Sequence, residues 1–300
     1  MKKIEIIKKL GLLSCLILTL TTIQSQDIIN YYEALYQGDL LEVKGEIDSA
    51  IIVYEKAFNQ VKYVHSPLLH KVLRMSKKVN DKKRIKQYKT LIKQRKKCPD
   101  QNKFLLEKVD SLLKIDQKQI RIKKYILAAN YMLKCEEDSN CDSSSDEYKT
   151  QSKLFYEWEA SFEKNANHLL LLFDEYGYLG EEKIGFDNFY KVIVMLFHYE
   201  ADTNNVILGS YLRKALYDNK LLPTYFTLIL DRHLQATTGA QKYWTWNVYE
   251  KKTQPNFTKD QKQAILKLRE EIGIFGSDFW FEYNKSKQIW YLRNKYLLFR

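Results

Sequence analysis

Polar side chains interrupt the apolar stretches in the C-terminal half of this 300-residue chain. His198 ends the most apolar stretch, and Asp231 and Arg232 lie inside another. A neutral imidazole accepts a proton, and a carboxylate such as Asp231 orients it for that task. A guanidinium binds a carboxylate or phosphate through two parallel donors. We therefore expect any site in this region to be lined by His198, Asp231, Arg232 and the following Gln241.

A structural role for the same residues stays open. Adjacent helical positions diverge by about 100°, so Asp231 and Arg232 do not face one small pocket without long reach. Charges in an apolar stretch must be paired or exposed, which favours a salt-bridge network. His198 has the corresponding interpretation of a hydrogen-bonded histidine at the edge of the core.

Motifs that define common enzymes are missing from the sequence. It contains no G-x-S-x-G, no H-E-x-x-H, no phosphate-binding glycine loop and no dinucleotide fingerprint. No cysteine spacing resembles a zinc site. We therefore expect a binding protein before an enzyme, with no cofactor and no metal.

The first residues have the pattern of an export signal. Four lysines and one glutamate precede an uncharged stretch from Leu10 to Ile23. A basic start followed by a short apolar stretch is typical of a signal peptide, and the stretch is too short to span a membrane. We expect residues 1–25 to be removed, with cleavage after Ser25. The alternative is a lipid anchor on Cys15, which would leave few apolar residues before the cysteine.

An exported chain permits disulfide bonds. Cys135 and Cys141 bracket five residues that can fold back as a loop, so we expect these two cysteines to pair. Cys98 would be left over. We predict a periplasmic or secreted protein with no membrane-spanning segment after cleavage.

The elements that position these residues are predicted to be helices. Ten glycines and four prolines are too few for the frequent turns of a strand-rich fold, and 45% of the residues are hydrophobic. The sequence thus predicts a mainly α protein with enough apolar material for a core. The C-terminal aromatic segments around 279–292 form either two short strands or a helical cap.

Residues 26–135 are predicted to form helical hairpins. Small residues and tyrosine recur at helical spacing at Gly38, Ala50, Tyr54 and Ala57, with Gly45 at a turn. This pattern resembles one tetratricopeptide unit of about 34 residues. A degenerate second hairpin covers 67–96. Residues 102–133 form one long helix or two helices that meet near 116–117.

An acidic, Ser-rich stretch over 136–150 is predicted to be a linker, followed by a helical domain over 151–300. This domain resembles an uncharacterised bacterial family with H-x-D, L-x-D-R and Q-x-Y-G-T-Q motifs. The resemblance rests on His198 with Asp202, on Leu230-Asp231-Arg232, on Gln241 with Tyr243, and on 268–274. It adds Asp202 and Tyr243 to Gln241 as expected binding residues. His198 and Asp202 are spaced more widely than in that motif, and Trp244 replaces its glycine.

The chain is basic, with a net charge of +12. Residues 71–97 hold ten lysines and three arginines against one acid, Asp81, so this segment is either an anion-binding face or a solvated helix surface. It lacks the aromatics that stack single-stranded nucleic acid, which argues against that partner. A basic surface outside the cytoplasm faces anionic envelope polymers or phospholipid.

We expect the chain to act as an exported binding or scaffolding module whose partner is a protein or an envelope polymer. The alternative function is a hydrolase that uses His198 with Asp231 and Arg232 on an anionic or glycan substrate.

Overall fold

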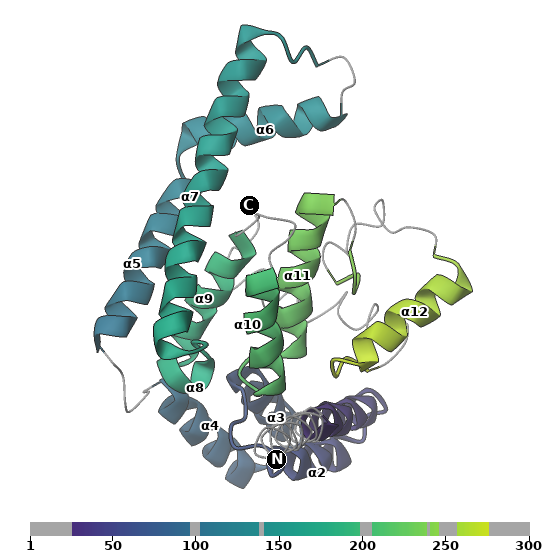
Figure 1. The fold of residues 1–300 in the computed structure, drawn as a ribbon. Coiled ribbons are helices and arrows are strands. Elements are labelled where there is room, and N and C mark those ends of the chain that lie inside the picture. The colour runs from purple at the N-terminus through teal and green to yellow at the C-terminus, as the bar shows by residue number, and fades with distance from the viewer. Residues whose placement is uncertain are drawn as a thin grey trace, which may run out of the picture. The chain divides into compact units, whose positions relative to one another are not determined.

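The computed structural model describes residues 26–96, 103–137, 141–198, 206–238, 241–245 and 257–275. All regular secondary structure in these segments is helical, so the prediction of a mainly α fold is confirmed (Figure 1). No helix in the described segments is long and apolar enough to cross a membrane. The predicted signal peptide, Cys98, Asp202 and the C-terminal aromatic segments lie outside them.

The chain divides into two compact units. Unit 1 comprises 1–93, 213–223 and 251–291, and unit 2 comprises 94–212, 224–250 and 292–300. The linker expected over 136–150 falls inside unit 2, between two helices that pack against each other.

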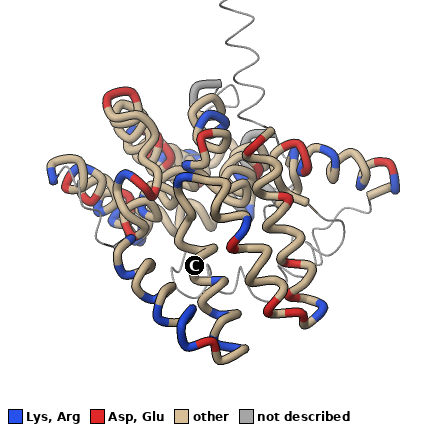
Figure 2. The backbone as a smooth tube through the Cα atoms, turned by 90° about the horizontal axis from the view of Figure 1, so that it is seen from below, with Lys and Arg blue, Asp and Glu red and all other residues tan. Residues whose placement is uncertain are grey.

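The helices of unit 1 come from three parts of the chain. They are a helix over 26–43, α2 (Ile47–Phe58), α3 (Ser66–Lys78), most of α4 (Lys82–Lys96), the end of α10 (Val206–Tyr217) and α12 (Lys259–Glu270). Basic positions follow one another along α4, whereas most other helices carry both signs of charge (Figure 2).

Two glycines allow the first hairpin of unit 1 to close. Gly45 has φ +84°, a left-handed conformation that glycine adopts at little cost, and it turns the chain into α2. Gly38 faces Tyr54 across the hairpin so closely that an added Cβ would lie 2.5 Å from the ring. Ala50 and Ala57 are fully buried on α2. The small residues in the sequence pattern thus mark a close approach of two helices.

The second hairpin consists of α3 and α4. Pro67 lies in the first turn of α3, where a missing N–H costs nothing. Asn80 has φ +56° in the turn, and the Asp81 side chain accepts a hydrogen bond of 3.0 Å from the backbone N–H of Arg84. This carboxylate therefore caps the start of α4.

Unit 2 contains the longest helix. Its helices are α5 (Lys103–Ile120), α6 (Lys123–Glu137), α7 (Asp146–Tyr176), α8 (Glu181–Ile184), α9 (Phe186–His198), the start of α10 and most of α11 (Pro223–Thr238). α7 packs against α5, α6 and α9 (Figure 1). α9 is buried on nearly every side, as its apolar sequence indicates.

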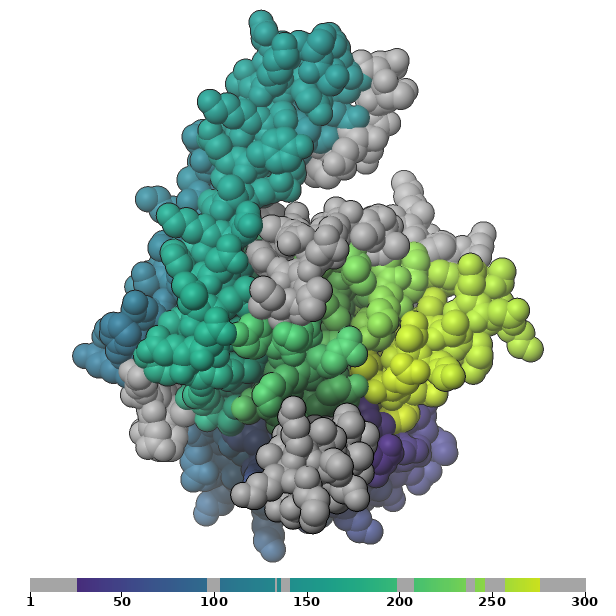
Figure 3. Space-filling view, viewed as in Figure 1, coloured from purple at the N-terminus to yellow at the C-terminus, as the bar shows by residue number. Residues whose placement is uncertain are grey.

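α6 and the N-terminal half of α7 make a two-helix layer, the teal region at the top of Figure 3. Cys135 and Cys141 are joined by a disulfide beside this layer, with their Cα atoms 5.2 Å apart. The break between α5 and α6 lies at 121–122, a few residues after the position near 116–117 expected from the sequence. Asp116 lies within α5 because its side chain is buried against α9, so it does not mark a helix end.

Two Gly→Ala substitutions in helices should shift stability in opposite directions. Alanine is a better helix former than glycine by about 1 kcal/mol. A Cβ at Gly209 in α10 meets no described atom within 4 Å, so Gly209→Ala should stabilise the protein by about 0.5–1 kcal/mol. Gly38→Ala should instead destabilise it by about 1–3 kcal/mol, because the Cβ overlaps Tyr54. Urea denaturation measures both, and stabilisation by Gly38→Ala would contradict the close packing.

Candidate functional site

The last residue of α9 pairs with a buried carboxylate of α5. The Nδ1 atom of His198 lies 2.7 Å from Oδ2 of Asp116. The Asp116 side chain is only 1% exposed, and the His198 side chain is 14% exposed. A carboxylate in this position favours the tautomer with hydrogen on Nδ1 and leaves Nε2 as the acceptor. We call His198 and Asp116 the histidine pair.

Aromatic rings from α7 hold the imidazole from another side. The ring of Phe162 lies 5.3 Å from that of His198, and Trp158 lies 5.3 Å from Phe162. Trp158 is itself fixed, since its Nε1 donates a 3.2 Å hydrogen bond to the carbonyl of Gln119. Three helices, α5, α7 and α9, therefore determine the position of one imidazole.

Asp231 does not orient His198, contrary to the sequence-based hypothesis. Its carboxylate accepts hydrogen bonds from the backbone N–H groups of Lys242, Tyr243 and Thr245 at 2.7–2.9 Å, and from the Thr245 hydroxyl at 2.7 Å. Complete burial raises the pKa of Asp231, and the four donors act in the opposite direction. Asp231 therefore binds the segment after α11 to that helix.

Arg232, by contrast, does lie close to His198 in the fold. Its Nε donates a hydrogen bond to the carbonyl of Phe197, the residue before His198. Terminal carbonyls of a helix lack an intrahelical donor, so this guanidinium caps the end of α9. Asp231 and Arg232 have separate partners, as the angle between adjacent helical positions predicts.

Gln241 and Tyr243, two further predicted site residues, have partners other than the histidine pair. The amide of Gln241 donates a 3.3 Å hydrogen bond to Gln235. Tyr243 is 2% exposed, and its ring lies 6.0 Å from Phe226, so it belongs to the core. Of the four side chains expected to converge, His198 and Arg232 share the end of α9, and Asp231 and Gln241 serve the structure around α11.

Sequence reasoning missed Asp116, although the sequence carried a signal for it. Leu105, Val109 and Leu112 are buried on one face of α5, and Asp116 occupies the next position of the same face. A charged residue at a core position needs a partner. The sequence did not show which of the five histidines would supply it.

The histidine pair can support proton transfer. In the described segments no group of three histidine, cysteine or acidic side chains is placed to hold a metal ion. The pair offers acid–base chemistry or hydrogen bonding at Nε2 of His198.

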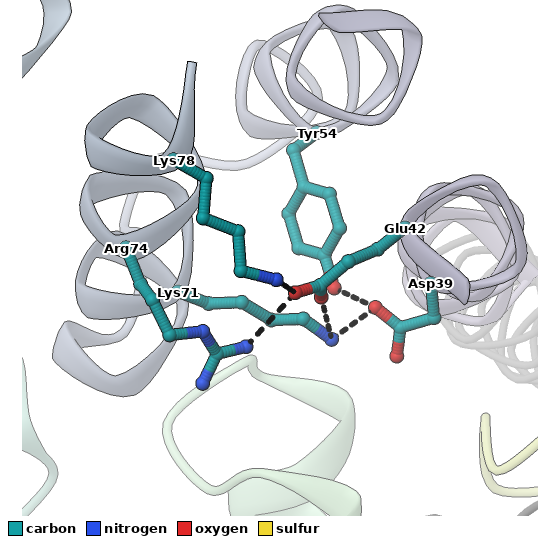
Figure 4. Close-up of polar contacts among 6 residues, drawn as sticks. All are labelled: Asp39, Glu42, Tyr54, Lys71, Arg74 and Lys78. Carbon is teal, nitrogen blue, oxygen red and sulfur yellow. Dashed lines mark hydrogen bonds and ion pairs between the residues drawn. The ribbon is translucent and has the colours of Figure 1, made fainter. Parts of the chain in front are cut away.

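A second polar cluster lies in unit 1, where the two hairpins stack. Figure 4 shows its six residues, to which we refer as the hairpin ion cluster: Asp39, Glu42, Tyr54, Lys71, Arg74 and Lys78. Asp39 accepts hydrogen bonds from Lys71 and from the Tyr54 hydroxyl. Glu42 pairs with Arg74 at 3.3 Å and with Lys78 at 3.1 Å. The cluster joins the helix over 26–43 to α3.

The cations of this cluster are more accessible than its central acid. The Glu42 side chain is 7% exposed, whereas those of Arg74 and Lys78 are 48% and 47% exposed. Burial raises the pKa of Glu42, but Lys71, Arg74 and Lys78 outweigh burial and lower it overall. The exposed donors of Arg74 and Lys78 can bind an acidic group from outside the protein.

Removing the Glu42 charge should change the pH dependence of stability. Because the folded-state pKa is lowered, Glu42 stabilises the protein above its unfolded pKa, and this contribution is lost as pH falls through the folded pKa. Glu42→Gln should cost about 1–2 kcal/mol at neutral pH, and this cost should shrink as pH falls through the lowered folded-state pKa. Urea denaturation across this range measures the difference. A constant difference between variant and wild type would contradict the ion pairs.

The histidine pair should show strong energetic coupling. His198→Ala leaves the buried Asp116 carboxylate with only a 3.3 Å hydrogen bond from the Gln117 side chain, and should cost about 3–5 kcal/mol. Combining it with Asp116→Ala should recover part of the loss, with a coupling of about 1–3 kcal/mol. Additive losses in urea denaturation would show that the two side chains do not depend on each other.

A scan against protein-family models and searches of curated proteins and of solved structures find no match to this chain.

Proposed function

We propose that the protein is an exported binding or scaffolding module of the cell envelope, and that the stacked hairpins of unit 1 form its binding surface. The observation that carries this proposal is the regular stacking of the two hairpins. Asp39 contacts Lys71 and Glu42 contacts Arg74, each 32 positions along, so the first helices of the two hairpins pair. Glu55 contacts Arg84, 29 positions along, so the second helices pair as well.

This stacking supports a binding role because it builds an extended surface from equivalent helices. The first helices carry all the charged residues of the hairpin ion cluster, and the side chains of Arg74 and Lys78 are half exposed. A rigid helix that presents a guanidinium and an ammonium one turn apart fits a partner with carboxylate or phosphate groups. A protein segment rich in acidic side chains, or an anionic envelope polymer, has this chemistry.

Charge removal at the exposed cations tests the proposal. Arg74→Gln with Lys78→Gln should abolish capture of a partner from the envelope fraction of the source cells, measured by quantitative crosslinking. The matched control is Lys114→Gln with Lys214→Gln, which removes the same charge from side chains 77% and 76% exposed. Equal capture by both double variants would contradict the proposal. The proposal that the protein is exported has its own test. An intact Met1, found by N-terminal sequencing of the isolated protein, would contradict export without bearing on the binding surface.

One observation favours a second function, acid–base catalysis of the hydrolase type. Asp116 orients His198 from a buried position, and Arg232 lies at the same helix end, where it can serve an anionic substrate. In this scheme His198 acts as a general base through Nε2, and Asp116 takes the orienting role first given to Asp231.

A panel of phosphate esters, carboxyl esters and glycosides tests this second function. Turnover lost in His198→Gln that circular dichroism shows to be folded, but kept in His168→Gln, a change at an exposed histidine of α7, would support it. Turnover that survives both changes would exclude His198 as its base.

A further inference from the structure

A row of exposed lysines runs along α4. Lys82, Lys86, Lys89 and Lys93 follow one another at intervals of three or four residues, and all four are exposed. Residues at these intervals are neighbours on one side of a helix. The row, which we call the lysine ridge, extends about 16 Å along the helix axis.

The acids closest to the ridge already bind another side chain. Arg84 forms two 2.9 Å hydrogen bonds to the Glu55 carboxylate and one of 2.9 Å to Asp81. α4 contains no acidic residue, and no ridge lysine forms an ion pair with any residue in the described segments. Arg84 thus engages both of these acids, and the four ridge lysines form no ion pair within the described segments.

The other side of α4 packs into the protein. Tyr88 is 3% exposed and Ile92 is 8% exposed, and the Tyr88 hydroxyl donates a 3.2 Å hydrogen bond to Glu55. The helix therefore cannot turn its apolar side outward. The residues exposed beside the ridge include Gln87 and Thr90 and are polar, without an aromatic ring for base stacking or an apolar side chain for insertion into a bilayer.

We propose that the lysine ridge docks the protein on a membrane surface that contains anionic phospholipid. Lysines are compact charges on flexible stems, which suit mobile headgroup phosphates better than they suit planar, bidentate recognition. Anionic bilayers attract basic segments within about a Debye length, and each added lysine strengthens the attraction. A straight row on a packed helix matches a flat surface. The ridge shares no side chain with the hairpin ion cluster, so this proposal stands or fails separately.

Binding to vesicles tests this proposal. The full chain is mixed with vesicles of phosphatidylglycerol and phosphatidylcholine, or of phosphatidylcholine alone, and bound protein is measured by co-sedimentation at low and high salt. The ridge variant changes Lys82, Lys86, Lys89 and Lys93 to Gln. The matched control changes four exposed lysines of other helices to Gln, at Lys118, Lys149, Lys153 and Lys164. All three proteins share the N-terminal segment, so its contribution cancels in the comparison.

The wild type and the control should bind the anionic vesicles, and the ridge variant should bind them about 100-fold more weakly at low salt. A charge-retaining variant with arginine at the four ridge positions should bind like the wild type, which separates loss of charge from loss of fold. Equal binding by the ridge variant, an equal loss in the control, or loss in the arginine variant would overturn the proposal. Displacement of the wild type from the vesicles by duplex DNA at equal phosphate concentration would also overturn it, in favour of a free polyanion.

Discussion

The carboxylates of the first hairpin bind the cations of the second, and the arrangement of unit 1 depends on this pairing. Asp39 and Glu42 engage α3, and Glu55 engages Arg84 of α4. The Asp39–Lys71 and Glu55–Arg84 contacts are partly buried, and Arg84 binds the Glu55 carboxylate through two parallel hydrogen bonds. The pairing has a second consequence for the basic segment. Arg84 binds both Glu55 and Asp81, and no acid in the described segments pairs with a lysine of the ridge.

Asp116 and Asp231, two of the buried carboxylates of unit 2, are satisfied in different ways. Asp116 pairs with the imidazole of His198, a side chain that can accept or donate a hydrogen bond at its other nitrogen. Asp231 is satisfied chiefly by backbone N–H groups, which do not titrate, and this arrangement fixes the segment after α11. The Asp116–His198 pair is compatible with acid–base chemistry, whereas the hydrogen bonds to Asp231 have a structural role. The carboxylate that matters for His198 is therefore the one on α5.

Much of the helical structure could be predicted from the sequence because it rests on local rules. Gly45 ends the first helix of unit 1 because its φ is positive, and Gly38 faces Tyr54 because a small residue permits close packing. The apolar stretch of α9 indicated burial on nearly every side. The end of α5 was harder to place, because Asp116 resembles a polar break in the sequence.

The sequence by itself determined the mainly helical fold, the turn at Gly45 and the excess of positive charge, since the fold class and the turn depend on residues within a few positions of one another. Only the tertiary structure decided the partners of the buried charges. Asp116 and His198 are 82 positions apart in the sequence. The segment that follows α11 folds back so that its backbone N–H groups reach Asp231. A buried carboxylate needs a hydrogen-bond donor because it carries a charge. The packing of α5, α7 and α9 decides which donor lies close enough to bind Asp116.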